Sequence, residues 1–277
     1  LINDNNLLVL EINNDQLKQF YEKCQKDKLI GIDTEFYRVN TYHPKLCLIQ
    51  ISNLSQSIII DPICGKLEEK FLENLLFNQS IIKVFFAASQ DLEIFYKIFN
   101  KIPKPVFDLQ LCISLLNKNS SLSYSSACRN FLAININKNN QFVDWRKRPL
   151  SKDKVRYAIN DVKYLLPLYN KLNLKIDFTK KINDLKKIHE KLVNPNTYSE
   201  KPSVAWKKLR FIPKTSEDLD KLKRVCEIRE KIAIKKNVPV KRIIKNFEIK
   251  LFFNSKSSLK LKKKIINKVQ NNELKTI

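Results

Sequence analysis

The sequence predicts a mixed α/β fold in the first part of the chain and a smaller helical part at its C-terminal end. Two observations favour this fold class. Short apolar runs of strand length alternate with amphipathic helical stretches, and from Leu109 onward the pattern is mainly helical. Strands that come first and helices that follow are typical of a mixed sheet with helices on its faces.

The individual elements are read from the spacing of apolar residues. In residues 15–26, Leu17, Phe20, Tyr21 and Cys24 recur at i, i+3, i+4 and i+7, which places them on one face of a helix. The other early elements are strand candidates at 7–10, 29–36, 46–52, 57–61 and 81–87 and helix candidates at 67–77 and 89–99.

Several details of these elements are specific enough to compare with the structure. Alternation of side chains in 46–52 predicts a strand with one buried and one half-exposed face. Ser89 is the expected N-cap of the helix that starts there, and Ser151 lies at the start of a helix over 151–172. The prolines in 103–105 indicate a loop.

The composition excludes several classes of protein. Of the 277 residues, 43% are hydrophobic, which is enough for a core and excludes wholesale disorder. No uncharged apolar run approaches the roughly 18–20 residues of a membrane span, and residues 1–6 lack the basic start of a signal peptide. Six scattered cysteines favour reduced thiols over disulfides or zinc. We therefore expect a cytoplasmic protein without a membrane partner.

The charge of the chain is strongly positive, with a formal net charge of +24. Residues 201–277 hold 23 lysines and arginines against 7 acidic residues, so most of the excess lies near the C-terminus. A surplus of this size predicts a polyanionic partner, and nucleic acid is the commonest one. The alternative is a compositional bias, because the chain is rich in Lys, Asn and Ile and has only 2 glycines and no Met.

Acidic residues in three separated segments are the strongest chemical signal. Asp33 and Glu35 lie at i and i+2 of a predicted strand and therefore share one of its faces. An apolar strand has little reason to carry two such acids unless a cation neutralises them; the alternative is a solvent-exposed strand end. Asp91 follows a second apolar strand, and Tyr157 and Asp161 share one helical face. Four carboxylates and one phenol form an oxygen-only ligand set, which suits Mg²⁺ or Mn²⁺.

The surroundings of these acids resemble the three exonuclease motifs of the ribonuclease D family, in the family's order. The matching stretches are Asp33-Thr-Glu35 with residues 38–50, Ser89-Gln-Asp91-Leu-Glu93, and residues 144–150 followed by Tyr157 and Asp161. The chain departs from the family's pattern at His43 and Gln90. The resemblance covers most of residues 7–170.

This resemblance implies a DEDD-type 3′-5′ exonuclease of the tyrosine subclass, with a ribonuclease-H-like fold and two divalent ions, Mg²⁺ or Mn²⁺. It implies that Asp33 bridges the two ions and that Glu35, Asp91 and Asp161 complete their ligand shells. Tyr157 is then expected to orient the attacking water or to help deprotonate it.

Residues next to the acids are candidates for substrate binding. By resemblance, Thr34 and Phe36 are expected to contact the terminal nucleotide, and their alternative is ordinary strand packing. Trp145, Arg146 and Arg148 combine stacking and phosphate-binding capacity, so we expect them on the substrate side.

The C-terminal quarter also resembles the family. Residues 202–253 are similar to the segment that leads into the helicase-and-ribonuclease-D C-terminal (HRDC) module and to that module's central helices. We expect an exonuclease domain over 1–190, a linker over 191–215 and an HRDC-like module, which is shorter than usual, over 216–277. The module is expected to clamp the RNA backbone; the alternative is a basic bundle that only packs on the catalytic domain.

The sequence therefore predicts a monomeric, metal-dependent 3′-5′ exoribonuclease. By resemblance, its substrates are transfer-RNA precursors and other structured RNAs with 3′ extensions, and its products are nucleoside 5′-monophosphates. Two alternatives stay open. One is a DNA exonuclease of the same superfamily, because the carboxylates act on a phosphate that RNA and DNA share. The other is a nucleic-acid-binding protein that has kept the fold without its activity.

Overall fold

The computed structural model divides the chain into two compact units. It describes residues 7–9, 14–65, 69–117, 120–136, 143–173 and 178–253, together with 263, 265 and 267. The first unit is Leu1–Tyr37 with Leu46–Tyr198, and the second is Arg38–Lys45 with Ser199–Ile277. Most of residues 254–277, which are rich in lysine, lie outside the described residues.

The first unit is built on a six-stranded mixed sheet in the order β1-β4-β3-β2-β5-β6. β3 and β4 are antiparallel, whereas β1 pairs with β4, β2 with β5 and β5 with β6 in parallel. The strands are β1 (Leu7–Val9), β2 (Leu29–Tyr37), β3 (Lys45–Ser52), β4 (Ser57–Ile60), β5 (Ile82–Phe85) and β6 (Val106–Asp108).

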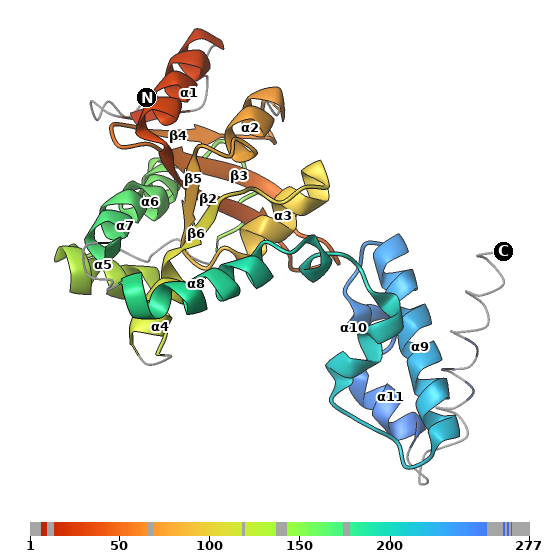
Figure 1. Ribbon diagram of the computed structural model, residues 1–277. Coiled ribbons are helices and arrows are strands. Elements are labelled where there is room, and N and C mark those ends of the chain that lie inside the picture. Colours follow the sequence, from red (N-terminus) through yellow and green to blue (C-terminus); the bar gives the residue numbers. More distant parts are fainter. Residues whose placement is uncertain are drawn as a thin grey trace. The chain divides into compact units, whose positions relative to one another are not determined.

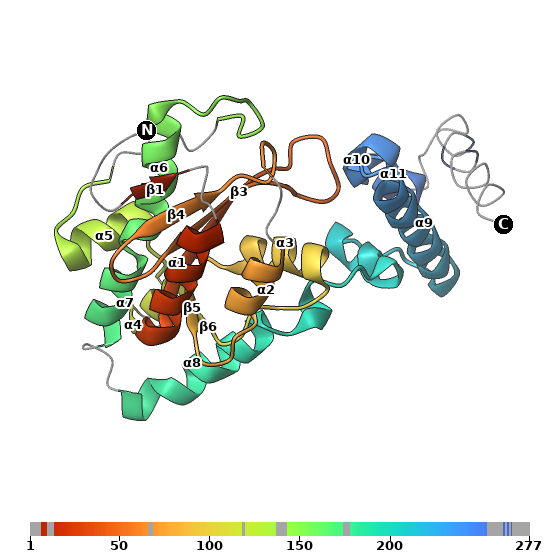
Figure 2. The same cartoon turned by 90° about the horizontal axis from the view of Figure 1, so that it is seen from above.

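Helices cover both faces of this sheet (Figures 1 and 2). One face packs Ile30, Ile32 and Ile49 against Phe20 of α1 and Phe95 of α3. The helices on that face are α1 (Asn14–Asp27), α2 (Glu69–Leu76) and α3 (Ser89–Phe99). The helices associated with the other face are α4 (Leu109–Leu116), α5 (Tyr124–Leu132), α6 (Lys152–Lys163) and α7 (Leu165–Asn173). Next in the chain come α8 (Phe178–Leu192) and the 3₁₀ helix η1 (Pro195–Thr197). The predicted α/β layering is therefore confirmed.

Three details of the sequence prediction are wrong. β3 is buried on both faces from Cys47 to Ser52, because helices cover each side of the sheet. The N-cap of α3 is Ala88, which has no capping side chain, and not Ser89. The single helix expected over 151–172 is two helices that meet at Tyr164, although Ser151 does cap the first of them.

The sequence reading also missed some elements, among them β6, which begins directly after the prolines expected to mark a loop, and α8. Within the part of the chain that the structure describes, no helix is both long and apolar enough to cross a membrane.

Gly31 of β2 allows α7 to approach the sheet closely. A Cβ atom at this position would lie 2.6 Å from Ser52 Oγ and 3.0 Å from Leu165 Cβ, so the neighbours would have to shift. We predict that Gly31→Ala lowers the free energy of unfolding by about 1–3 kcal/mol. Gly65→Ala is the matched control, because a Cβ there meets only Asp61 O at 3.3 Å. Thermal unfolding of both variants checks the prediction, and equal melting temperatures would contradict it.

The second unit has a small helical core of its own. Its elements are the 3₁₀ helix η2 (Pro202–Leu209) and the helices α9 (Ser216–Lys235), α10 (Val240–Ile243) and α11 (Asn246–Phe252). Ala205 and Leu209 of η2 pack with Leu222 and Cys226 of α9 and with Ile249 of α11. Thus η2, which falls within the linker expected over 191–215, contributes to this core. The HRDC-like character of the unit stays a prediction.

The loop that connects β2 to β3 belongs to this second unit. Tyr42 donates its hydroxyl hydrogen to Glu230 Oε1 at 2.7 Å, and Asn237 Oδ1 accepts from the backbone N–H groups of Tyr42 and His43. Arg242 donates to Asn40 Oδ1 at 2.7 Å. The loop directly after the strand of Asp33 and Glu35 is therefore held by the C-terminal helices.

Candidate metal centre

Asp33 and Glu35 lie on the part of β2 that extends past its neighbour β5. The pairing of β2 with β5 covers Leu29 to Gly31, and β5 ends at Phe85. Because the two acids are two residues apart in a strand, they share one face of the sheet. Both side chains are only partly buried. The end of β5 therefore leaves room beside these acids for groups from other elements.

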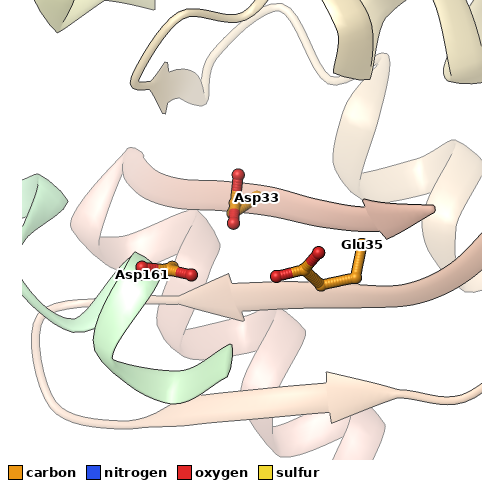
Figure 3. A group of neighbouring side chains, drawn as sticks. All are labelled: Asp33, Glu35 and Asp161. Atoms are coloured by element: carbon orange, nitrogen blue, oxygen red, sulfur yellow. The ribbon is translucent and has the colours of Figure 1, made fainter. Parts of the chain in front are cut away.

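Helix α6 brings Asp161 to the same place. Val155, Ala158 and Ile159 of α6 pack against Leu48 of β3, and Ser52 Oγ donates to the carbonyl of Val162 at 2.9 Å. With α6 fixed in this way, one carboxylate oxygen each of Asp33, Glu35 and Asp161 lies within 4.8 Å of the others. Figure 3 shows the three carboxylates gathered between β2 and α6.

Asp91, the fourth predicted acid, stands beside this group of three. It lies in the first turn of α3 and is 5% exposed. Its Oδ1 accepts a hydrogen bond of 2.5 Å from the hydroxyl of Thr34, the residue between Asp33 and Glu35. Among the neighbouring charges, Asp91 makes the largest contribution to the raised pKa of Asp33. Asp91 therefore lies close enough to the other acids for its charge to raise the pKa of both Asp33 and Glu35.

Burial and mutual repulsion make these carboxylates hard to ionise without a cation. Burial is the first cause in each case: it raises the pKa of Asp33 well above its ordinary value and that of Glu35 to about 9. The pKa values of Asp91 and Asp161 are both raised to about 7. Within the described residues, no lysine or arginine forms an ion pair with any of the four. An oxygen-only acidic site of this kind fits a hard divalent cation.

Tyr157 lies one helical turn before Asp161 on α6 and is hydrogen-bonded to its carboxylate. Burial and the nearby acids raise the pKa of its hydroxyl, so the phenol is protonated at neutral pH. The ring of Trp145 packs against the Tyr157 ring, with 5.9 Å between the centroids. The hydroxyl is therefore positioned at the edge of the carboxylate group.

The residues predicted to bind substrate have mixed environments. Thr34 is buried and bonded to Asp91, and Phe36 is half-buried on β2. Trp145 is only 3% exposed, so its packing on Tyr157 does not favour stacking with a base. The substrate roles of these three residues stay predictions.

The two predicted arginines also make internal contacts. Arg148 forms a two-point ion pair with Asp61, in which Nε donates to Oδ2 at 2.5 Å and Nη2 to Oδ1 at 2.7 Å. Arg146 is paired with Asp144 and lies over the ring of Tyr37, yet its side chain is 43% exposed. The more exposed Arg146 is therefore the better placed of the two to meet a phosphate.

Asp108 is a site residue that the sequence reading missed. Its carboxylate accepts hydrogen bonds from the backbone N–H groups of Ala87 and Ala88, and from two N–H groups at the start of α4. Ala87 has a φ of 64°, a conformation that costs free energy for a residue with a Cβ. By holding this turn, Asp108 fixes the start of α3 and hence the position of Asp91. Asp108 is the last residue of β6, which the sequence did not predict, and no other feature of the sequence indicates its role.

The sheet order, the helices on both faces and the clustered carboxylates define an α/β protein with a centre suited to divalent metal ions. The sequence model of a family described as 3′-5′ exonuclease matches residues 12–177. The chain belongs to this 3′-5′ exonuclease family.

One curated protein and one solved structure are similar to most of this chain. A ribonuclease D of Sphingobium indicum is 35% identical over 231 residues, which are 83% of this chain and 60% of that protein. The structure of Escherichia coli RNase D, an exoribonuclease involved in structured RNA processing, aligns over 97% of this chain and 75% of that one, with a TM-score of 0.79 and 23% identity. This likeness confirms the expected fold. The chain spans only 53–61% of the length of curated ribonuclease D relatives.

A third protein, Brucella melitensis NrnC, has been solved with bound Mg²⁺. It aligns over 70% of this chain and 90% of that one, with a TM-score of 0.58 and 23% identity. This second structural likeness supports the α/β fold of the first unit.

Proposed function

We propose that this protein is a metal-dependent 3′-5′ exoribonuclease that releases nucleoside 5′-monophosphates. The observation that carries the proposal is the convergence of Asp33, Glu35 and Asp161, with Asp91 beside them, in a site without a compensating cation among the described residues. A non-catalytic descendant would have no reason to keep four acids in so costly an arrangement.

Each residue of the centre has a distinct role in the proposed reaction. As the resemblance to the ribonuclease D family implies, Asp33 would hold both of two divalent ions, Mg²⁺ or Mn²⁺. Glu35, Asp91 and Asp161 would supply further carboxylate ligands to them. When bound, such a pair of ions activates water near neutral pH and stabilises charge on the leaving oxygen. Tyr157, protonated and bonded to Asp161, orients the attacking water through its hydroxyl.

RNA is the proposed substrate, in particular transfer-RNA precursors and other structured RNAs with 3′ extensions. The support is the similarity to ribonuclease D proteins at 35% identity and the basic character of the C-terminal quarter. We assign the exonuclease domain to residues 1–190 and an HRDC-like module to residues 216–277, in a monomer; of the linker expected over 191–215, η2 packs with the helices of the module. Arg146 and Phe36 are the proposed contacts to the 3′ end.

The competing proposal is a DNA exonuclease of the same superfamily, because the carboxylates alone do not distinguish the two sugars. Matched RNA and DNA oligonucleotides, labelled at the 5′ end, separate the two when each is incubated with Mg²⁺ or Mn²⁺. We expect stepwise shortening of the RNA from its 3′ end, release of mononucleotides and complete inhibition by a chelator. Faster degradation of DNA would favour the competing proposal, and no degradation of either would refute both.

The basic C-terminal unit is proposed to hold the RNA backbone through phosphate contacts. Lys235, Lys236 and Lys241 are exposed near the end of α9 and in α10. Replacing all three with glutamate is expected to raise the apparent KM for RNA about tenfold with little change in kcat. The dependence of binding on salt should also become shallower, because fewer counterions are released. Binding and kinetics across a salt series measure both effects.

A matched triple substitution tests whether the effect is local. Lys18, Lys26 and Lys70 are also exposed but lie on α1 and α2, which cover the face of the sheet away from Asp33 and Glu35. Their replacement by glutamate makes the same change in net charge. Equal losses in the two triple variants would show that only total charge matters, and would contradict a clamp.

A further inference from the structure

Gln50, in the middle of β3, is a buried polar side chain without a partner. Its side chain is 0% exposed, and neither Nε2 nor Oε1 has a hydrogen-bond partner among the residues that the structure describes. Leaving a buried polar group unsatisfied costs roughly 1–3 kcal/mol. A side-chain amide in such a place implies a partner that the protein acquires in another state.

The neighbours of Gln50 show which face of the sheet it occupies. It stands opposite Ile59 of β4, and Ile59 packs in the same cluster as residues of α6. Two positions further along β3, Ser52 donates to the carbonyl of Val162 in α6. Residues i and i+2 of a strand share a face. Gln50 therefore faces α6, the helix that carries Tyr157 and Asp161.

The register with β2 brings Gln50 to the level of Asp33. β2 and β3 are hydrogen-bonded neighbours that run in opposite directions, as the strand arrows in Figure 3 show. A Cβ on Gly31 would lie 2.6 Å from Ser52 Oγ, so these two residues stand side by side. Because the strands are antiparallel, the residue two after Gly31 on β2, Asp33, is paired with the residue two before Ser52 on β3, Gln50. Directly paired residues on one face have Cβ atoms about 4.5–5.5 Å apart.

We propose that Gln50 is a positioning residue of the metal centre: its amide Nε2 donates a hydrogen bond to the carboxylate of Asp33 when a divalent cation is bound there. This inference rests on the proposed metal-dependent function. Carboxylates that ligate metals are commonly oriented by such outer hydrogen bonds, and losing one typically costs 10–100-fold in metal affinity or activity. Without a cation, the acids repel one another, and the amide stays unpaired.

A metal-binding measurement without RNA tests this role. Gln50→Met keeps the length of the side chain and removes both polar atoms. We expect its affinity for Mn²⁺, measured by calorimetry or by the electron paramagnetic resonance of free Mn²⁺, to fall about tenfold. In chelator, its melting temperature should equal or exceed that of the unchanged protein, because an unsatisfied buried amide has been removed.

Ile51→Met is the matched control, since Ile51 is equally buried on the opposite face of β3. We expect unchanged Mn²⁺ affinity in this variant. Two results would overturn the role of Gln50 while leaving the nuclease proposal intact: Mn²⁺ affinity within twofold of the unchanged protein, or a loss of stability in chelator with no loss of affinity. Failure of the unchanged protein to bind Mn²⁺ at all would instead refute both proposals.

Discussion

Replacing Asp33 with asparagine is expected to lower RNA hydrolysis at least about a thousandfold while the protein stays folded. Asp33 belongs to the group of three convergent carboxylates, and burial together with the charges of Asp91, Asp161 and Glu35 raises its pKa well above the ordinary value. An amide cannot supply the negative charge that holds two divalent ions. A thousandfold loss corresponds to about 4 kcal/mol of transition-state stabilisation, which is the scale expected from losing a metal-centred reaction. Initial rates on a labelled RNA oligonucleotide measure the effect.

The stability of the variant separates a chemical loss from unfolding. The carboxylate of Asp33 is destabilised by burial and by its neighbours, so an amide of the same size should leave stability in chelator unchanged or slightly raised. Asp153→Asn is a suitable control, because Asp153 is exposed and lies in the first turn of α6, whereas Asp161 lies in its last turn. Wild-type rates in purified Asp33→Asn protein would discredit the metal-centre assignment.

The residues of the centre that could be found from sequence are those fixed by local geometry. Asp33 and Glu35 share a face because a strand has a period of two, and Tyr157 and Asp161 share one because they are a helical turn apart. These shared faces depend only on the local strand or helix and not on the rest of the fold. The structure retains both, and Asp161 meets the first pair as expected.

The features that were missed depend on contacts between distant segments. The start of α3 has no local cap, because Asp108 supplies the acceptors for Ala87 and Ala88 from a different strand. That strand is only three residues long, too short to show a periodicity. β3 alternates as a half-exposed strand would, yet α6 covers its second face. Gln50, on the face of this strand that the alternation predicts to be half-exposed, is fully buried.

Ionisation of the carboxylates makes metal binding and stability depend on pH in opposite ways. In the metal-free protein the pKa values of Asp91 and Asp161 are raised to about 7, and that of Glu35 to about 9. The folded state therefore binds protons more tightly than the unfolded chain does. Stability from this source is fully present below the ordinary carboxyl pKa of about 4, and it is lost progressively as the pH rises from there to about 7 to 9. A bound cation must displace the same protons, so its affinity rises with pH over that range.

We predict that the melting temperature in chelator falls by about 2–4 °C between pH 6 and 8, and that saturating Mn²⁺ reverses the trend. The size follows from a loss on the order of 1 kcal/mol, which shifts the melting temperature by roughly 2–4 °C. Lys83 works against this trend, because burial lowers its pKa to about 7 and its own contribution rises with pH between about 7 and 10.5.

The contribution of the acids to this pH dependence is therefore measured by comparing the unchanged protein with a variant that lacks one acid. Asp161→Asn removes one acid and lessens the repulsion on the others, but leaves Lys83 untouched. We expect the fall in melting temperature from pH 6 to 8 to be smaller in this variant, and its Mn²⁺ affinity to rise less steeply with pH. If the melting temperature of Asp161→Asn depended on pH as that of the unchanged protein does in chelator, the buried acids would not be repelling one another. The physical basis for placing a cation among them would then be lost.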